Sequence, residues 1–230
     1  MKWELCVASL EGARLAEKHG LDRIETCIAL EQGGLTPSTA LVKWIRDTLD
    51  LEQHVLIRQR AGGFHYSYDE IVVMRDQILD MRSLGVKGIV VGALDAAGFP
   101  DKQALETWKR AAGDMDLTFH RAFDDVSDWE KSLEILVSMG FTRILTSGVS
   151  VSSEVEKACS LLLEKANGRI EIMMGGGLKP RMVPALKALG VDALHFSGTE
   201  MKEVDPSSLF ATQLLMPEAE KIQLFLQAGL

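Results

Sequence analysis

The sequence predicts a single-domain TIM barrel, that is, an α/β (β/α)8 barrel, and three observations support this prediction. Eight short apolar segments alternate with segments of helical spacing, and a four-fold internal repeat runs through the chain. A length of 230 residues suffices for one large core, and α/β barrels commonly use this much chain as one domain. The composition, 47% hydrophobic and 25% charged, is ordinary for a globular protein.

The apolar segments are short enough for strands buried on both faces of a parallel sheet. They are Trp3–Val7, Arg23–Cys27, His54–Arg58, Gly88–Val91, Leu117–His120, Arg143–Thr146, Ile170–Met173 and Ala193–Phe196. Between them, apolar residues recur every three or four positions, as at Ile71, Met74, Ile78 and Met81. This spacing is typical of amphipathic helices that cross from one strand to the next.

The internal repeat is a five-residue pattern that begins with Gly20, Gly85, Gly140 and Gly190. After the glycine come an apolar residue, a polar residue, a residue of any kind and a second apolar residue. Each glycine suits the left-handed cap that ends a helix, and the apolar residues that follow start every second strand. An open doubly wound sheet is the alternative architecture. The regular repeat, with a period of about two βα units, favours closure into a barrel.

Charge and the first residues of the chain exclude several classes of partner. The net charge of −8 is unfavourable for binding nucleic acid, and no run approaches the roughly 18 apolar residues of a membrane span. Glu4 interrupts the place where a signal peptide would build its apolar stretch, so we expect a cytoplasmic protein. Three cysteines, an odd number, are expected to be reduced thiols.

The first two predicted strands end alike, in Glu4-Leu5-Cys6 and in Glu25-Thr26-Cys27. A period of two places glutamate and cysteine on the same side of each strand, and neighbouring strands lie about 4.8 Å apart. Thiolates select Cu(I), so Cys6 and Cys27 are candidate metal ligands. The alternative is that both cysteines only pack in the core, as we expect of Cys159 on an apolar helix stripe.

Three arginines and a histidine follow the third and fifth predicted strands: Arg58, Arg60, His120 and Arg121. Active sites of such barrels form where strands run into their following loops, so we expect these groups at one mouth. Buried charges need partners, and we expect the two strand-end glutamates to oppose Arg58 and Arg60. The alternative is that these charges only fill the polar upper layer of the barrel.

A candidate anion site follows the last two strands, in Gly175-Gly176-Gly177 and in Ser197-Gly198. Barrel enzymes commonly bind phosphate there through backbone N–H groups, although a triple glycine is also typical of a tight turn. With Arg58, Arg60 and Arg121 this site would bind a small phosphorylated or carboxylated metabolite. Hydroxyls of Thr146-Ser147 would add donors, and Glu25 or His120 would transfer protons.

Two classes of barrel enzyme are disfavoured. No lysine ends a predicted strand, which argues against a Schiff-base aldolase. Only His120 and His195 are well placed among the histidines, and we find no spacing typical of a zinc or divalent-metal hydrolase. His195 itself is expected to be a satisfied core residue.

The chain resembles the CutC family from Trp3 to Ser197. The motifs that carry the resemblance are Glu4-Leu5-Cys6-Val7, Asp22-Arg23-Ile24-Glu25 with Cys27, Gly33-Gly34-Leu35-Thr36-Pro37-Ser38, Ile57-Arg58 with Arg60, Thr118-Phe119-His120-Arg121-Ala122-Phe123-Asp124, Ile144-Leu145-Thr146-Ser147-Gly148, Gly175-Gly176-Gly177, and Leu194-His195 with Ser197. The resemblance implies a cytosolic, oligomeric TIM barrel with a proposed role in copper homeostasis. It also implies that Cu(I) binds at Cys6 and Cys27.

The sequence departs from the family pattern on the mouth loops and in the tail. Gln32, Gln59, Ala61, Gly63 and Thr199 stand where the family usually has other residues. Ligand specificity is therefore open, and a barrel without enzymatic activity is a third alternative. We expect residues 1–200 to form the barrel. The divergent tail, 201–230, is expected to end in a helix that packs on the barrel or on a second subunit of a homo-oligomer.

Overall fold

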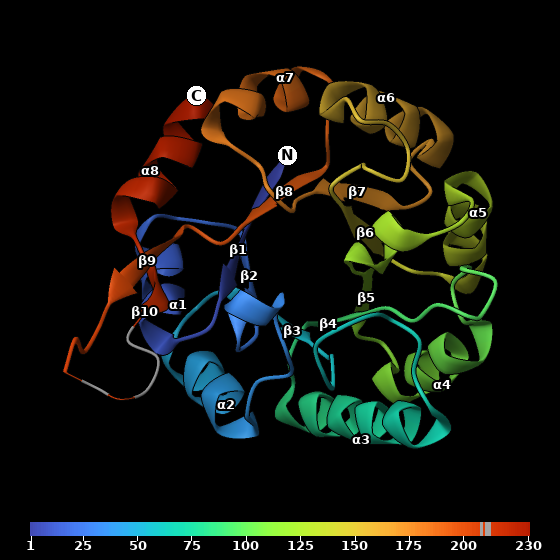
Figure 1. Cartoon of the computed structure of the whole chain (residues 1–230), viewed down its shortest axis with the longest axis horizontal. Helices are drawn as coiled ribbons and strands as arrows, with labels where there is room; N and C mark the ends of the chain where they lie inside the picture. Colours follow the sequence, from blue (N-terminus) through green and yellow to red (C-terminus); the bar gives the residue numbers. More distant parts are fainter. Residues whose placement is uncertain (208, 210–212) are drawn as a thin grey trace.

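The computed structural model describes residues 1–207, 209 and 213–230 and shows the expected closed barrel of eight parallel strands (Figure 1). Its strands are β1 (Lys2–Val7), β2 (Arg23–Thr26), β3 (Glu52–Leu56), β4 (Gly88–Val91), β5 (Asp116–Phe119), β6 (Arg143–Thr146), β7 (Glu171–Met174) and β8 (Ala193–Phe196). β1 pairs with both β2 and β8, which closes the ring. The prediction of a barrel over an open sheet is therefore confirmed.

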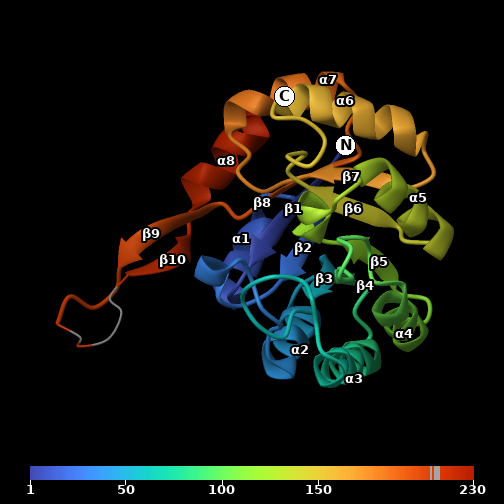
Figure 2. The ribbon, with the colours of Figure 1, turned by 45° about the vertical axis from the view of Figure 1, so that its right-hand side comes forward.

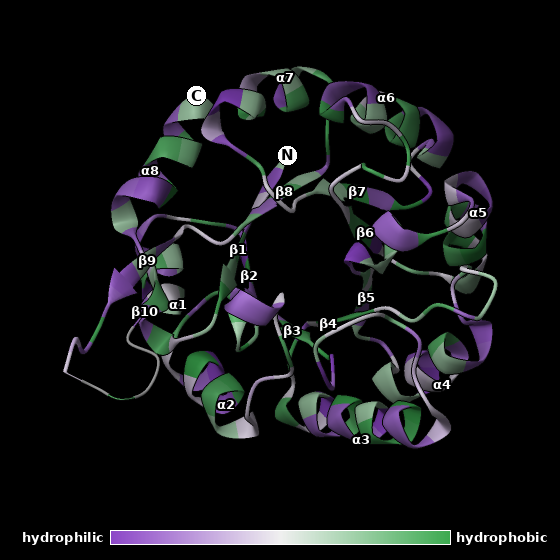
Figure 3. Ribbon diagram, viewed as in Figure 1, coloured by the Kyte–Doolittle hydropathy of each residue, from purple (hydrophilic) through white to green (hydrophobic). Residues whose placement is uncertain are grey.

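Helices surround the barrel on the outside (Figure 1). They are α1 (Leu10–Lys18), α2 (Thr39–Thr48), α3 (Tyr68–Leu84), α4 (Lys102–Ala112), α5 (Trp129–Met139), α6 (Val155–Ala166), α7 (Val183–Ala188) and α8 (Ala219–Ala228). Short 3₁₀ turns lie at η1 (Leu30–Gln32), η2 (Arg121–Asp125) and η3 (Pro180–Met182). The helices carry both hydrophobic and hydrophilic residues (Figure 3), and α3 buries Met74, Ile78 and Met81 against the barrel. Among the described residues, no helix combines the length and apolar character needed to cross a membrane.

Short polar residues and glycines set the helix boundaries. Ser67 begins α3 with a capping box, in which its side chain accepts from the N–H of Glu70 while the Glu70 carboxylate accepts from the N–H of Ser67. Gly85 and Gly140 end α3 and α5 in the left-handed conformation, with φ of 73° and 74°. The glycines of the repeat thus act as helix ends, as predicted.

The third strand ends earlier than predicted. β3 spans Glu52–Leu56, so Arg58 lies beyond the ladder, and its N–H is bound by the Thr36 hydroxyl at 2.9 Å. This places Arg58 on the mouth loop rather than within the barrel wall. β3 also begins two residues earlier than predicted, at Glu52 instead of His54. Glu52 already pairs with β2 there, because it lies opposite Arg23.

The barrel interior contains both apolar and charged side chains. The main hydrophobic core lies between strands and helices, while Cys6, Cys27, Leu56 and Val90 form a separate apolar cluster. Arg23 and Arg143 are among the largest fully buried side chains. Because a buried charge without a partner is costly, these arginines must be paired within the barrel.

The tail forms a hairpin and the last helix. β9 (Thr199–Glu203) pairs antiparallel with β10 (Gln213–Pro217), and the hairpin projects from the barrel (Figure 2). α8 then packs on the barrel wall, where the rings of Phe196 and Phe225 stack with centroids 4.3 Å apart. This packing brings residues of α8 to the rim of the barrel mouth.

Candidate functional site

A cavity of about 670 Å³ opens at the carboxyl ends of the strands. Its lining comes from strand ends, from the loops after β3, β5 and β7, and from α8. The sequence-predicted residues that line it are Cys6, Glu25, Arg58, His120, Arg121, Gly176, Gly177, Ser197 and Gly198. Arg60, Gly175 and Cys27 are not among its lining residues, and Cys27 lies directly beneath it against Cys6.

Cys6 lines this cavity, and the thiol of the buried Cys27 lies against the Cys6 thiol. Their sulfur atoms are 3.4 Å apart, and the Cys6 thiol also donates to Glu25 Oε2 at 3.1 Å. The hydrogen bond with Cys27, together with burial, raises the pKa of Cys6 well above 9.0. Cys159 lies apart in α6, where burial raises its pKa to about 12. The two strand-end cysteines are therefore close enough to act on one ligand.

His195 of β8 lies beside the thiols, between two glutamates. Its Nδ1 is 2.7 Å from Glu4 Oε1, and its Nε2 is 3.8 Å from Glu25 Oε2. Burial alone lowers the pKa of His195, but the charges of Glu25 and Glu4 outweigh it and the net pKa is raised. A carboxylate on one ring nitrogen is the arrangement that orients metal-bound histidines. Glu4 thus directs Nε2 toward Glu25 and Cys6.

The pKa values of the two glutamates are shifted in opposite directions. Burial favours the neutral form of both, but for Glu4 the hydrogen bond of His195 and the charge of Arg23 prevail, and its pKa falls well below 4.5. Burial prevails for Glu25, whose pKa is raised. Glu4 is therefore a fixed anion, whereas Glu25 can exchange a proton with Cys6 or His195.

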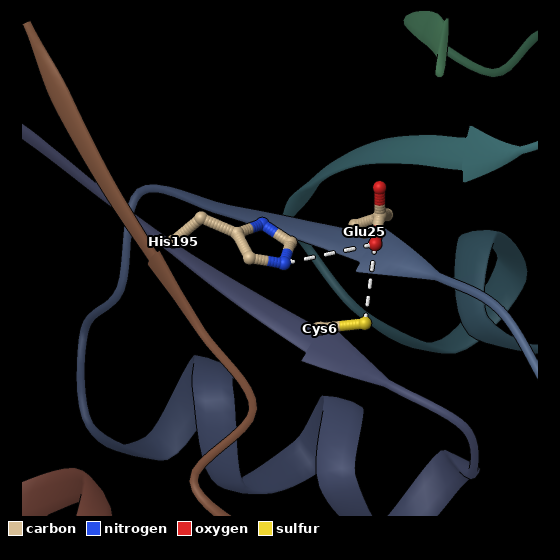
Figure 4. A group of neighbouring side chains, drawn as sticks. All are labelled: Cys6, Glu25 and His195. Carbon is tan, nitrogen blue, oxygen red and sulfur yellow. Dashed lines mark hydrogen bonds and ion pairs between the residues drawn. The ribbon is translucent and has the colours of Figure 1, made fainter. Parts of the chain in front are cut away.

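Cys6, Glu25 and His195 form a group able to hold a metal ion (Figure 4). One ligand atom from each lies within 4.8 Å of the others. A second such group, Glu52, His54 and Asp116, lies elsewhere in the barrel. Neither cluster is evident from the sequence, because its members come from two or three strands that are far apart along the chain.

The expected pairing of the strand-end glutamates with Arg58 and Arg60 is wrong. Glu4 pairs with Arg23, which lies directly opposite it on the neighbouring strand β2. Arg58 donates instead to the carbonyls of Gln32, Gly34 and Gly62 at 2.9, 3.0 and 2.7 Å. Arg58 stands above the strand ladder, so loop carbonyls are nearer to it than the glutamates are.

Arg60 points away from the cavity. Its guanidinium pairs with Glu70 and lies over the ring of Tyr66, 5.0 Å from the centroid. It also donates to loop carbonyls, including that of His65 at 2.7 Å. Arg60 therefore stabilises the loop after β3 and is not available to a ligand in the cavity.

The side chain of Arg121, from η2, packs against the backbone of the glycine loop after β7. Gly176 and Gly177 have φ of 78° and 96°, and a Cβ on Gly176 would collide with the Arg121 guanidinium. Arg121 is half exposed and donates to Asp124 at 2.8 Å. Glycine is thus required at 176 both for the backbone and for the approach of Arg121.

The hydroxyls expected to bind an anion after β6 are engaged elsewhere. Thr146 Oγ1 and Ser147 Oγ donate to the Asp124 carboxylate at 2.5 and 2.9 Å, and the N–H of Ser147 donates to it at 2.9 Å. Asp124 therefore ties the loop after β5 to the end of β6. The expectation that these hydroxyls face a ligand is wrong, because both donate their hydrogen bonds to the carboxylate of Asp124.

His120 is neutral near physiological pH. Burial, aided by the charge of Arg58, lowers its pKa to about 3. Its Nδ1 accepts the N–H of Ala122 at 3.1 Å, so the proton must reside on Nε2. His120 is thus a hydrogen-bond donor through Nε2 and a poor proton acceptor.

Two residues of the site were not identified from the sequence. His195 was expected to be structural, although it alternates with Ser197 on one face of β8, and this was the available signal. Lys221 lines the cavity from α8 and donates to the carbonyl of Thr199 at 3.0 Å. No sequence signal could identify Lys221, because it follows a hairpin in a tail without a recognisable motif.

Comparisons with known proteins agree with this architecture. Residues 1–200 match the sequence profile of the CutC family. A CutC family protein of Agrobacterium fabrum is 42% identical over 210 residues, which cover 90% of this chain and 83% of that protein. A human relative, named copper homeostasis protein cutC homolog, is 39% identical over 202 residues, covering 87% and 74%.

A solved structure is also similar. The crystal structure of a CutC copper homeostasis protein from Streptococcus agalactiae aligns with a TM-score of 0.80 at 35% identity, covering 85% of this chain and 98% of that one. The sequence profile, the relatives and the shared fold all agree. The chain therefore belongs to the CutC family.

Proposed function

We propose that this chain binds Cu(I) through Cys6 and Cys27 and serves copper homeostasis in the cytoplasm. The single observation that carries the proposal is the 3.4 Å separation of the two sulfur atoms, at a point where Cys6 lines an open cavity. Soft thiolates are the ligands that select Cu(I), and free thiols persist in a reducing compartment. Relatives named for copper homeostasis support the same assignment.

The neighbouring residues suit a soft metal ion. His195 presents a second kind of donor that copper accepts, and Glu4 holds the far side of its ring. Glu25 accepts a hydrogen bond from the Cys6 thiol and is placed to receive its proton when the thiolate forms. When bound, the metal would supply the charge that keeps both thiols deprotonated.

The test is an anaerobic Cu(I) titration in competition with a chromophoric Cu(I) chelator. The doubly substituted Cys6→Ser, Cys27→Ser variant is expected to lose at least 100-fold in affinity. The matched control is Cys159→Ser, since Cys159 is also buried but lies in α6. Equal affinity of the double variant and the wild type would overturn the proposal.

A second candidate function is binding, or turnover, of a small anionic metabolite in the same cavity. Cationic groups from three elements favour it: Arg58 after β3, Arg121 in η2 and Lys221 in α8. Backbone N–H groups of the glycine loop and of Ser197 and Gly198 would add donors. In an enzyme, Glu25 with its raised pKa would transfer protons, and His120 would donate a hydrogen bond from Nε2.

The second candidate is tested by thermal unfolding with inorganic phosphate, pyrophosphate and a panel of phosphorylated and carboxylated metabolites. At least one anion should raise the Tm of the wild type, and Arg121→Gln should abolish that rise. Arg110→Gln, on the exposed face of α4, is the matched control. A Tm unaffected by every anion, or raised equally in Arg121→Gln, would contradict it.

A further inference from the structure

A second group of possible metal ligands lies at the pole of the barrel opposite the mouth. Glu52 is the first residue of β3, Asp116 is the first residue of β5, and His54 lies two positions after Glu52. The amino-terminal ends of barrel strands form the face that stabilises the fold rather than the one that acts on substrates. Any ligand bound there would therefore be separate from the cavity of the mouth.

A glycine brings His54 and Asp116 together. In the barrel register, His54 lies opposite Gly88 of β4, and Gly88 lies opposite Asp116. A Cβ at position 88 would lie 2.7 to 2.9 Å from three atoms of the imidazole ring. Because Gly88 has no side chain, the ring can cross β4 toward the carboxylate of β5.

The imidazole of His54 is fully buried and lacks an aligned hydrogen bond. Its Nε2 is 3.3 Å from Glu52 Oε1 and 3.8 Å from Asp116 Oδ2, but neither ring nitrogen makes a hydrogen bond of good geometry with any described residue. A buried polar group normally has such a partner. The ring thus faces two carboxylates without an N–H aimed at either.

Among the described residues, an arginine reaches the carboxylate of Glu52 but not that of Asp116. Arg23 approaches Glu52 at 3.4 Å, but it also pairs with Glu4. Arg143, the other buried arginine, pairs with Glu171. Among the described residues, His54 is the only ion-pair partner within 4.0 Å of Asp116.

We propose that His54, Glu52 and Asp116 bind a divalent transition-metal ion of the zinc class at this pole. Zinc bonds to nitrogen and carboxylate oxygen of about 2.1 Å place neighbouring tetrahedral ligands about 3.4 Å apart. The distances of 3.3 and 3.8 Å around His54 Nε2 match this spacing with little rearrangement. The carboxylates are 30% and 29% exposed, so an ion can arrive from solvent and keep a water ligand.

Such an ion would stabilise the fold. It would join β3 to β5 across Gly88 of β4, and it would supply positive charge beside Asp116, which among the described residues has only His54 as an ion-pair partner. A ligand that binds only the folded chain increases the free energy of unfolding. At ligand concentrations above Kd, this increase grows with the logarithm of the concentration divided by Kd. The proposal does not depend on Cu(I) binding at the mouth.

The experiment uses the full chain with Cys6→Ser and Cys27→Ser, which removes the thiols of the mouth. Co²⁺ is titrated by its visible absorption, and Zn²⁺ by its effect on Tm. We expect one equivalent of Co²⁺ to bind and Zn²⁺ to raise Tm. Added His54→Gln or Asp116→Asn should weaken binding at least ten-fold and abolish the Tm rise, whereas added His195→Gln should leave both intact.

Three results would overturn the proposal: no binding by the double cysteine variant, binding unaffected by His54→Gln and Asp116→Asn, or binding lost with His195→Gln. The last would locate the ion at the mouth. Tm and near-ultraviolet circular dichroism without metal show whether each variant folds. Asp116→Asn, which is nearly isosteric, serves as the test if His54→Gln does not fold.

Discussion

Glu4 and His195 face each other across the closure of the barrel, with Glu4 Oε1 2.7 Å from His195 Nδ1. The first strand of the chain thereby orients a side chain of the eighth. Arg23 holds the other oxygen of the same carboxylate. The same carboxylate thus joins β1 to β2 and orients the imidazole of β8 beside the Cys6 thiol, so we expect both stability and Cu(I) binding to depend on it.

Replacing this glutamate should therefore affect both properties. Glu4→Gln removes the nearer of the two carboxylates that pair with Arg23 and leaves only Glu52, at 3.4 Å. Losing one partner of a buried ion pair costs about 3–5 kcal/mol. The same change should lower Cu(I) affinity by about 10–100-fold, as for other residues that orient a metal ligand. Urea unfolding and competitive Cu(I) titration measure the two effects. The control Glu130→Gln removes an exposed ion pair with Lys165 and should change neither stability nor Cu(I) affinity. A Glu4→Gln variant with wild-type stability and wild-type Cu(I) affinity would contradict this prediction.

Cu(I) affinity should rise with pH between 6 and 8. The raised pKa of Cys6 keeps its thiol protonated in this range, so binding as thiolate must release that proton. Competitive titration at several pH values gives the slope of log affinity against pH. We expect Cys6→Ser to reduce this slope by about one, and Cys159→Ser to leave it unchanged. An affinity independent of pH in the wild type is incompatible with Cys6 as a ligand.

His120 should make the fold sensitive to mild acid. Its native pKa of about 3 lies below the value of about 6.5 in an unfolded chain, so between these values the unfolded state binds a proton that the native state does not. Stability should fall as the pH is lowered from about 6.5 to about 3. His120→Asn keeps an acceptor for the N–H of Ala122 but does not titrate. Urea midpoints should show a shallower pH dependence for this variant, and identical slopes would refute the assignment.

Gly88→Ala should destabilise the barrel through contact with His54. The added methyl group meets three ring atoms of a fully buried side chain, and such overpacking costs about 1–3 kcal/mol. In a chain that also carries His54→Ala, the cost of Gly88→Ala should largely disappear. A double-mutant cycle by urea unfolding measures this coupling. If the two changes in the free energy of unfolding are additive, contact with His54 is not the cause of the destabilisation by Gly88→Ala.

Much of the fold is predictable from the sequence, for identifiable reasons. Strands buried on both faces leave continuous apolar runs, and glycines such as Gly85 and Gly140 mark helix ends by a conformation that other residues avoid. The end of β3 was misplaced because Ile57 continues the apolar run past Leu56, while the N–H of Arg58 donates to the Thr36 hydroxyl instead of to a neighbouring strand. Such a contact from a distant loop leaves no local signal.

The candidate site is only partly predictable. The alternation along β1 and β2 predicts that glutamate and cysteine share a side of each strand, and Cys6 and Glu25 line the cavity in the structure. The pairing of charges depends on register, and the register that sets Glu4 against Arg23 and His195 comes from closure of the whole ring. Lys221 reaches the cavity only because α8 packs beside β8. These relationships come from tertiary structure and are not encoded in any short motif.

Copper K-edge X-ray absorption of the Cu(I)-loaded chain would show directly whether the thiols of β1 and β2 hold copper. We expect two sulfur ligands in the wild type and none in the Cys6→Ser, Cys27→Ser variant. Copper bound by nitrogen and oxygen alone in the wild type would contradict this expectation.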